Sequence, residues 1–191
     1  MIRGGMMALL LAMAGSGALA QPLDSAAVKP MLFAVEGAEV EIIPNDFLPA
    51  DQAAILKQVG AAQPYYGAIA VSPDEGLMVE ATVAAANHHS TEAARGFALA
   101  SCDAKRKGAR PCEIVALIRP KGWQARPFQL SSGATAGFLG DYAKIRRDKA
   151  FAISPSTGLW GLGKGKDAAT RAVADCKTKG KAADCIVAVL D

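Results

Sequence analysis

The clearest pattern along the chain is a short, mostly apolar segment followed directly by a turn sequence, and it occurs twice. Residues 67–71 precede Ser-Pro-Asp-Glu-Gly at 72–76, and residues 149–153 precede Ser-Pro-Ser-Thr-Gly at 154–158. A short apolar run bounded by turn residues is typical of a buried strand. Proline presets φ for the turn, and glycine accepts the positive φ that leads into the next strand. We therefore expect strand, turn and strand in both places.

A helical pattern and a final apolar segment follow each strand pair. Apolar residues recur at helical spacing at positions 94, 97, 98 and 102, and again at 169, 172, 173 and 176. Ser90 or Thr91 can cap the first helix, and Asp167 can cap the second. The last strands are expected at 112–117 and 185–190.

Because three blocks recur in the same order, we interpret the chain as an internal repeat. Two tandem strand-strand-helix-strand repeats can lay their strands in a common sheet with both helices on one face, which predicts an α+β fold. An N-terminal extension adds a strand pair within 31–43, turned at Glu36-Gly37, and a helix over 51–61.

The predicted organisation has five parts. They are a signal peptide at 1–20, the N-terminal extension at 21–64, the first repeat at 65–119, a linker at 120–148 and the second repeat at 149–191. The linker is expected to hold one short helix near 135–142. Residues 65–191 are expected to form one compact domain.

The first 20 residues have the pattern of a cleavable secretory signal. Arg3 supplies a positive charge, residues 6–14 are apolar, and Ala18-Leu19-Ala20 supplies small residues before Gln21. The apolar run is shorter than the roughly 20 residues that a membrane span needs. We therefore expect a periplasmic or secreted protein without a transmembrane anchor.

The chain has four cysteines, all after the predicted signal. An even number in a small exported protein is the usual disulfide case, and four cysteines allow three connectivities. In both repeats one cysteine ends the helix and the next opens the following strand, which can bring the two within disulfide range. This relation favours Cys102–Cys112 and Cys176–Cys185.

Charge changes the picture only in the loops between these cysteines, because the net charge of the chain is just +3. Both loops are basic, which indicates either a solvated surface or an anion-binding face for an acidic envelope polymer, lipid or protein. Nucleic acid is not expected as a partner, because no aromatic residues lie between these basic residues. The candidate residues are Lys105, Arg106, Lys107, Arg110, Lys177, Lys179 and Lys181.

Candidate chemistry is sparse, and no cofactor is expected. His88, His89 and Glu92 could form a weak metal site if the helix begins early, although a third and fourth ligand are not evident. Ser72 and Ser154 are most simply turn residues, because no base is placed to activate either hydroxyl. The Gly-Lys-Gly-Lys run at 163–166 lacks the Ser or Thr of a phosphate-binding loop.

The apolar strand, the Ser-Pro-x-x-Gly turn, the helix ending in cysteine and the cysteine opening a strand resemble domain-of-unknown-function family 4189, a group of small exported bacterial domains with a cysteine pair. The resemblance covers 66–118 and 149–190 as tandem copies. Residues 67–70 match the family's Gly-Ala-Ile-Ala opening, and Trp160-Gly161 matches the Trp-Gly that follows its turn. The family has no agreed catalytic residues, so the resemblance implies a fold and a compartment.

These observations predict an exported, non-enzymatic envelope module that binds an acidic partner through the basic loops. The alternative is a hydrolase or metal-dependent enzyme centred on the loop that holds His88 and His89.

Overall fold

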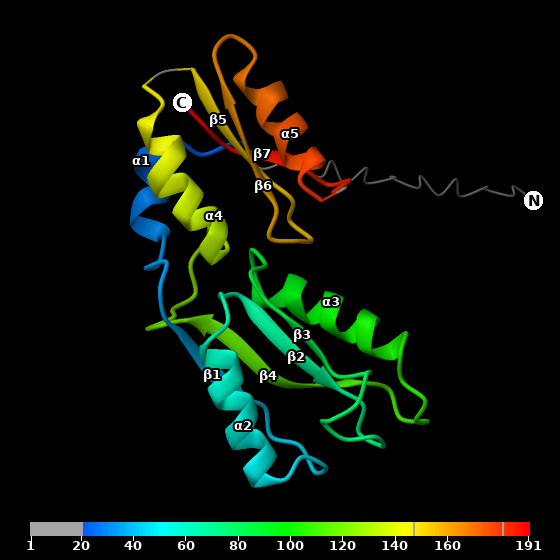
Figure 1. The fold of residues 1–191 in the computed structure, drawn as a ribbon. Helices are drawn as coiled ribbons and strands as arrows, with labels where there is room; N and C mark the ends of the chain where they lie inside the picture. The colour runs from blue at the N-terminus through cyan, green and yellow to red at the C-terminus, as the bar shows by residue number, and fades with distance from the viewer. Residues whose placement is uncertain (1–20, 147, 181) are drawn as a thin grey trace, which may run out of the picture.

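A computed structural model describes residues 21–146, 148–180 and 182–191, so the signal peptide predicted at 1–20 lies outside the described residues. The described chain has seven strands in two antiparallel sheets, with helices packed against both (Figure 1). The predicted α+β class is confirmed.

The two sheets have related strand orders. The first sheet has the order β1-β4-β2-β3, formed by β1 (Ala38–Ile42), β4 (Glu113–Pro120), β2 (Gly67–Val71) and β3 (Val83–Ala85). The second has the order β6-β5-β7, formed by β6 (Trp160–Lys164), β5 (Lys149–Ile153) and β7 (Ile186–Leu190). We call residues 65–119 the first unit and residues 149–191 the second unit. In each unit the first strand lies between the other two.

Helices cover both faces of each sheet, which corrects the prediction of helices on one face only. In the first unit, α3 (Thr91–Asp103) packs on Ala68 and Ala70 of β2, while α2 (Ala50–Ala61) packs on Ile69 and Val71 of the same strand. All five residues of β2 are buried. Because successive side chains of a strand point to opposite faces, this pattern requires cover on both sides.

The second sheet is covered in the same way. The helix α5 (Ala168–Thr178) packs on Ala150 and Ala152 of β5. On the opposite face, Phe151 packs against α1 (Ser25–Val28) and the π-helical turn Phe138–Tyr142, which continues α4 (Ser132–Gly137). The short helix predicted near 135–142 is therefore present, and it forms part of this layer.

The expected common sheet is divided into two, and a segment from outside each unit pairs with its last strand. β1 pairs with the outer edge of β4. On the outer edge of β7, the Leu23 amide donates to the carbonyl of Ala188 (3.0 Å), and the Leu190 amide donates to the carbonyl of Leu23 (2.9 Å). Both segments come from the N-terminal extension, which therefore pairs with the outer edge of the last strand of each unit.

The extension itself differs in part from the prediction. The helix predicted over 51–61 is α2, but only β1 forms from the strand pair expected within 31–43. The chain before β1 packs against the linker instead. The carbonyl of Leu32 accepts a hydrogen bond from Arg126 (2.7 Å), and the ring of Phe33 lies under the Arg126 guanidinium, 3.6 Å from its centroid.

The two units also share an irregularity of register. The pairing of β2 with β4 shifts between Ile69 and Ala70, and that of β5 with β7 shifts between Phe151 and Ala152. These positions correspond when the two Ser-Pro turns are aligned. The units therefore match in strand order, helix placement and strand register.

Candidate functional site

The two cysteine pairs are Cys102–Cys112 and Cys176–Cys185, with Cα atoms 6.1 and 6.2 Å apart. Each disulfide joins the C-terminal part of a helix to the start of the next strand, as predicted from the sequence. All four cysteines are buried. Paired structural cysteines of this kind indicate an oxidising compartment.

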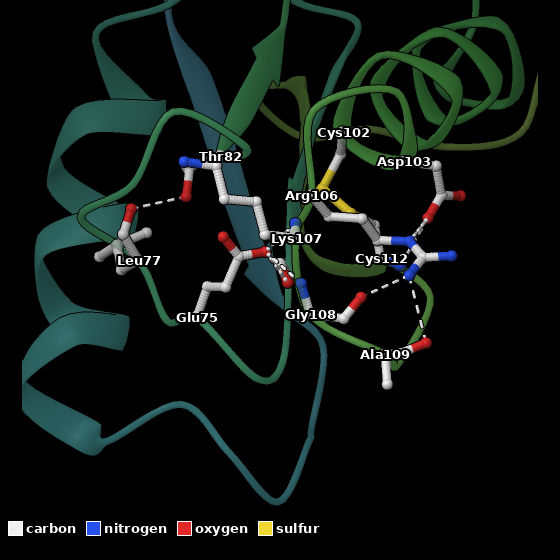
Figure 2. Close-up of a disulfide and its surroundings, with 11 residues drawn as sticks. Glu75, Leu77, Thr82, Cys102, Asp103, Arg106, Lys107, Gly108, Ala109 and Cys112 are labelled. Atoms are coloured by element: carbon white, nitrogen blue, oxygen red, sulfur yellow. Dashed lines mark hydrogen bonds and ion pairs between the residues drawn. A yellow bond between two sulfur atoms is a disulfide. The ribbon is translucent and has the colours of Figure 1, made fainter.

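The first inter-cysteine loop is held by the carboxylate of Glu75, which lies in the Ser-Pro turn (Figure 2). This carboxylate accepts hydrogen bonds from the backbone amides of Lys107 (2.9 Å) and Gly108 (3.1 Å). It also accepts one from the hydroxyl of Ser72 (2.7 Å). The hydrogen bond from Ser72, followed by those from the two amides, holds the pKa of Glu75 below its usual value. The turn and the loop therefore form one connected structure.

Arg106 is bound within the same loop (Figure 2). Its Nε pairs with Asp103 (2.7 Å), and its Nη1 donates to the carbonyls of Gly108 (2.6 Å) and Ala109 (3.1 Å). Asp103 also accepts from the amide of Cys112 (3.0 Å), and this bond, together with Arg106, lowers the pKa of Asp103. Arg106 thus stabilises the loop beside the disulfide, and its guanidinium is largely committed to that role.

Arg110 is engaged in a similar way. Its guanidinium pairs with Glu113 (3.1 Å) and Asp46 (3.5 Å), and it lies over the ring of Phe47. Its backbone amide donates to the carboxylate of Asp74 (2.8 Å), the neighbour of Glu75 in the turn. Acidic side chains therefore surround the first basic loop and offset its charge.

The second unit also links its turn to its inter-cysteine loop, but here the carboxylate belongs to the loop rather than to the turn. Asp184, just before Cys185, accepts from the hydroxyl of Ser154 and from the amide of Ser156 (2.8 Å). Burial raises the pKa of Asp184, but these hydrogen bonds outweigh that effect and leave it lowered. Ser72 and Ser154 are both fully buried, and each donates to a carboxylate. Both hydroxyls therefore have structural roles in the turns.

Among the basic residues of the second loop, Lys179 pairs with Asp175 (2.9 Å), and its amino group lies 4.1 Å from the ring centroid of Trp160. Lys181 lies outside the described residues. Lys105, Lys107 and Lys177 are exposed and form no ion pair within the part of the chain that the structure describes. The loop after α3 and the loop after α5 lie at separate places on the molecule (Figure 1). The candidate anion-binding residues therefore do not form one surface.

His89 joins the two units. Its Nδ1 accepts a hydrogen bond from the backbone amide of Ser131 (3.1 Å), so its Nε2 carries the proton and donates to the carbonyl of Leu159 (2.9 Å). The amide of His89 donates to the carbonyl of Thr157 (3.1 Å). The side chain is 4 % exposed, and burial lowers its pKa to about 4. Both ring nitrogens are occupied, which leaves neither for a metal ion.

The other candidate ligands do not converge on a metal site. His88 is buried against Phe97, its Nδ1 lies 3.2 Å from the carbonyl of Ala86, and burial lowers its pKa. Glu92 is exposed in the first turn of α3. Among the described residues, no group of three or more His, Cys, Asp or Glu side chains could hold a metal ion.

The glycines of the two Ser-Pro turns have different roles, which corrects the prediction that both supply a positive φ. Gly76 has φ +78°, and a side chain there would meet open space. Gly158 is not among the glycines with positive φ; instead, a Cβ there would lie 1.5 Å from the carbonyl oxygen of Asn87. Gly158 lets the second turn approach the backbone before His88. The sequence gives no signal for this contact, because it joins residues far apart in the chain.

Comparison with known proteins adds no identification: no family model matches the chain, nor does any curated protein or solved structure. The resemblance to family 4189 stays a prediction. Within the described part of the chain, no helix has both the length and the apolar character needed to cross a membrane.

Proposed function

We propose that this chain is an exported, non-enzymatic binding module of the bacterial envelope, either periplasmic or secreted. The observation that carries the proposal is the commitment of the chemically active side chains to structure. His89 and both turn serines are buried and hydrogen-bonded, and all four cysteines are paired. What remains for function is the surface. The resemblance to family 4189 supports an exported module.

The acidic partner contacts the exposed lysines between the paired cysteines, Lys105 and Lys107 in the first loop and Lys177 in the last turn of α5. A disulfide closes each loop. In the first unit Glu75 of the turn binds backbone amides of the loop, and in the second unit Asp184 of the loop binds the amide of Ser156 in the turn. The lysines therefore extend from a rigid base. An ammonium on a flexible stem binds anions as a point charge. The attraction is screened by salt, so binding weakens as ionic strength rises.

The test is retention of the purified protein on immobilised polyglutamate at two salt concentrations. Replacement of Lys105, Lys107 and Lys177 by glutamine is expected to abolish retention at low salt. The control is the same change at three other exposed lysines, Lys57, Lys121 and Lys166, which alters the net charge equally and is expected to keep most of the retention. Equal loss in both triple variants would show that only net charge matters, and this proposal would then fail.

Export is tested separately by mass spectrometry of the protein recovered from the periplasm. The expected mature chain begins at Gln21, after removal of residues 1–20. A dominant species that retains residues 1–20 would contradict export by a cleaved signal.

A further inference from the structure

Two neighbouring hollows line the boundary between the linker and the second unit. One has a volume of about 320 Å³ and the other about 380 Å³, and Pro127, Phe128 and Ile153 line both. Pro127 is exposed, and the other two are only half-buried. A ligand can therefore pass from one hollow to the other over these side chains without leaving the surface. Volumes of this size fall at the lower end of small-molecule sites.

The larger hollow is lined mainly by apolar side chains, and none of its lining side chains is charged. Leu23 is 36 % exposed there and Ile186 is 50 % exposed, so apolar surface is left in contact with water. Covering it with hydrocarbon is favourable. Its remaining lining residues are Gln21, Met31, Val187 and Ala188.

The smaller hollow is shallow and has more apolar than polar lining surface, but it contains one side chain of each charge, Glu92 and Arg126. Within the described residues, neither of them forms an ion pair. Arg126 is held in place by its bond to the carbonyl of Leu32 and by the ring of Phe33 beneath it. That bond uses one of the five donors of the guanidinium, so donors remain for an anion. Glu92 is exposed and can accept a cation.

We propose that the two hollows together bind a single-chain zwitterionic amphiphile, such as a lysophospholipid that carries a phosphate and an ammonium group. The alkyl chain lies in the apolar hollow against Leu23 and Ile186. The phosphate pairs with Arg126, and the ammonium pairs with Glu92. An opposite pair of charges beside an apolar hollow matches such a head group better than a head group with a single charge. This site is independent of the lysines proposed above to contact an acidic partner, none of which lines either hollow.

The experiment measures binding of dodecylphosphocholine to the purified, disulfide-bonded protein by calorimetry, below the concentration at which the ligand forms micelles. Dodecyl phosphate, dodecyltrimethylammonium and dodecyl maltoside have the same chain with an anionic, a cationic and a neutral head group. The zwitterion is expected to bind at least tenfold more tightly than any of the three. Equal affinity for all four would overturn the assigned head group, and absence of binding by dodecylphosphocholine would overturn the site.

Variants locate the site. Ile186→Glu places a charge in the apolar hollow and is expected to weaken binding at least tenfold. Ile55→Glu is the matched control, because Ile55 is similarly exposed (52 %) but lies on α2, away from both hollows. Glu92→Gln is expected to remove the preference for the zwitterion over the anionic ligand. Circular dichroism confirms that each variant is folded, and unchanged binding in folded Ile186→Glu would contradict the proposal.

Discussion

His89 donates a hydrogen bond to the carbonyl of Leu159, 70 residues further along the chain, at 2.9 Å. The other nitrogen of the same ring accepts from the amide of Ser131. One neutral side chain therefore connects the first unit, the linker and the second unit. A protonated ring has no acceptor, so protonation of His89 must break the bond from Ser131.

This relationship predicts a loss of stability in mild acid. Burial lowers the pKa of His89 from 6.5 to about 4, so between these values the unfolded chain binds a proton that the folded chain does not. Stability is then fully present above pH 6.5 and falls as the pH drops towards 4. The total loss from this group is about 3 kcal/mol, at 1.36 kcal/mol for each unit of pKa shift. Urea unfolding at a series of pH values measures it.

The matched variant is His89→Gln, whose amide can donate and accept but does not titrate in this range. Between pH 6.5 and 4.5, its free energy of unfolding is expected to depend less steeply on pH than that of the native protein. The difference in slope corresponds to close to one proton taken up on unfolding. His88 also has a lowered pKa, so some slope remains. Identical slopes in the two proteins would mean that His89 does not control the acid response.

A second prediction concerns the close approach of the second turn to the loop before His88. Gly158→Ala would place a methyl group 1.5 Å from the carbonyl oxygen of Asn87, which forces the two segments apart. The expected cost is about 1–3 kcal/mol, as for other overpacked sites. Thermal unfolding measures the change.

Gly96→Ala is the control, because Gly96 lies in α3 and a side chain there meets nothing within 4 Å. It should stabilise the protein by roughly 0.5–1 kcal/mol, as alanine does in a helix interior. Opposite signs for the two substitutions would support the contact at Gly158. A neutral effect at Gly158 would contradict it.

The elements and the disulfides could be predicted from the sequence because their signals are local. The apolar strand β2, the cap at Ser90 and the relation of Cys102 to Cys112 each depend on residues near one another in the chain. The helices on the second face of each sheet were predicted as elements, but their packing on that face was missed, because α2 and α4 lie before the segments that show the repeated pattern. The division into two sheets was missed for a related reason, since it depends on where Leu23 and β1 pair.

The candidate sites were harder to judge, because their roles depend on distant partners. A basic loop has the same sequence whether its arginines face solvent or, like Arg110, bind Asp46. His89 is a candidate ligand by residue type, and only its contacts with Ser131 and Leu159 show that both nitrogens are used. Charge and residue type therefore identify candidates, while the long-range contacts determine their role.

The last prediction concerns Glu75 and Asp184, the carboxylates that link the Ser-Pro turn to the inter-cysteine loop in the first and second units. Glu75→Gln retains one acceptor but loses the charge that binds Ser72 and the amides of Lys107 and Gly108, so the first loop should loosen. Charge-assisted hydrogen bonds are stronger than neutral ones, and hydrogen exchange at these two amides is expected to accelerate. Asp184→Asn should have the same effect on the amide of Ser156, while leaving the first loop unchanged.

Glu80→Gln removes an exposed acid without such contacts among the described hydrogen bonds and ion pairs, and it should leave exchange at all three amides as in the native protein. The pKa values of Glu75 and Asp184 are lowered, so each carboxylate links its turn to its loop more tightly when it is ionised. Acidification through their folded pKa values should therefore reproduce the effect of the variants, after exchange rates are corrected for pH. If Glu75→Gln left the amides of Lys107 and Gly108 fully protected, the disulfide alone would hold the loop, and the paired roles of Glu75 and Asp184 would be wrong.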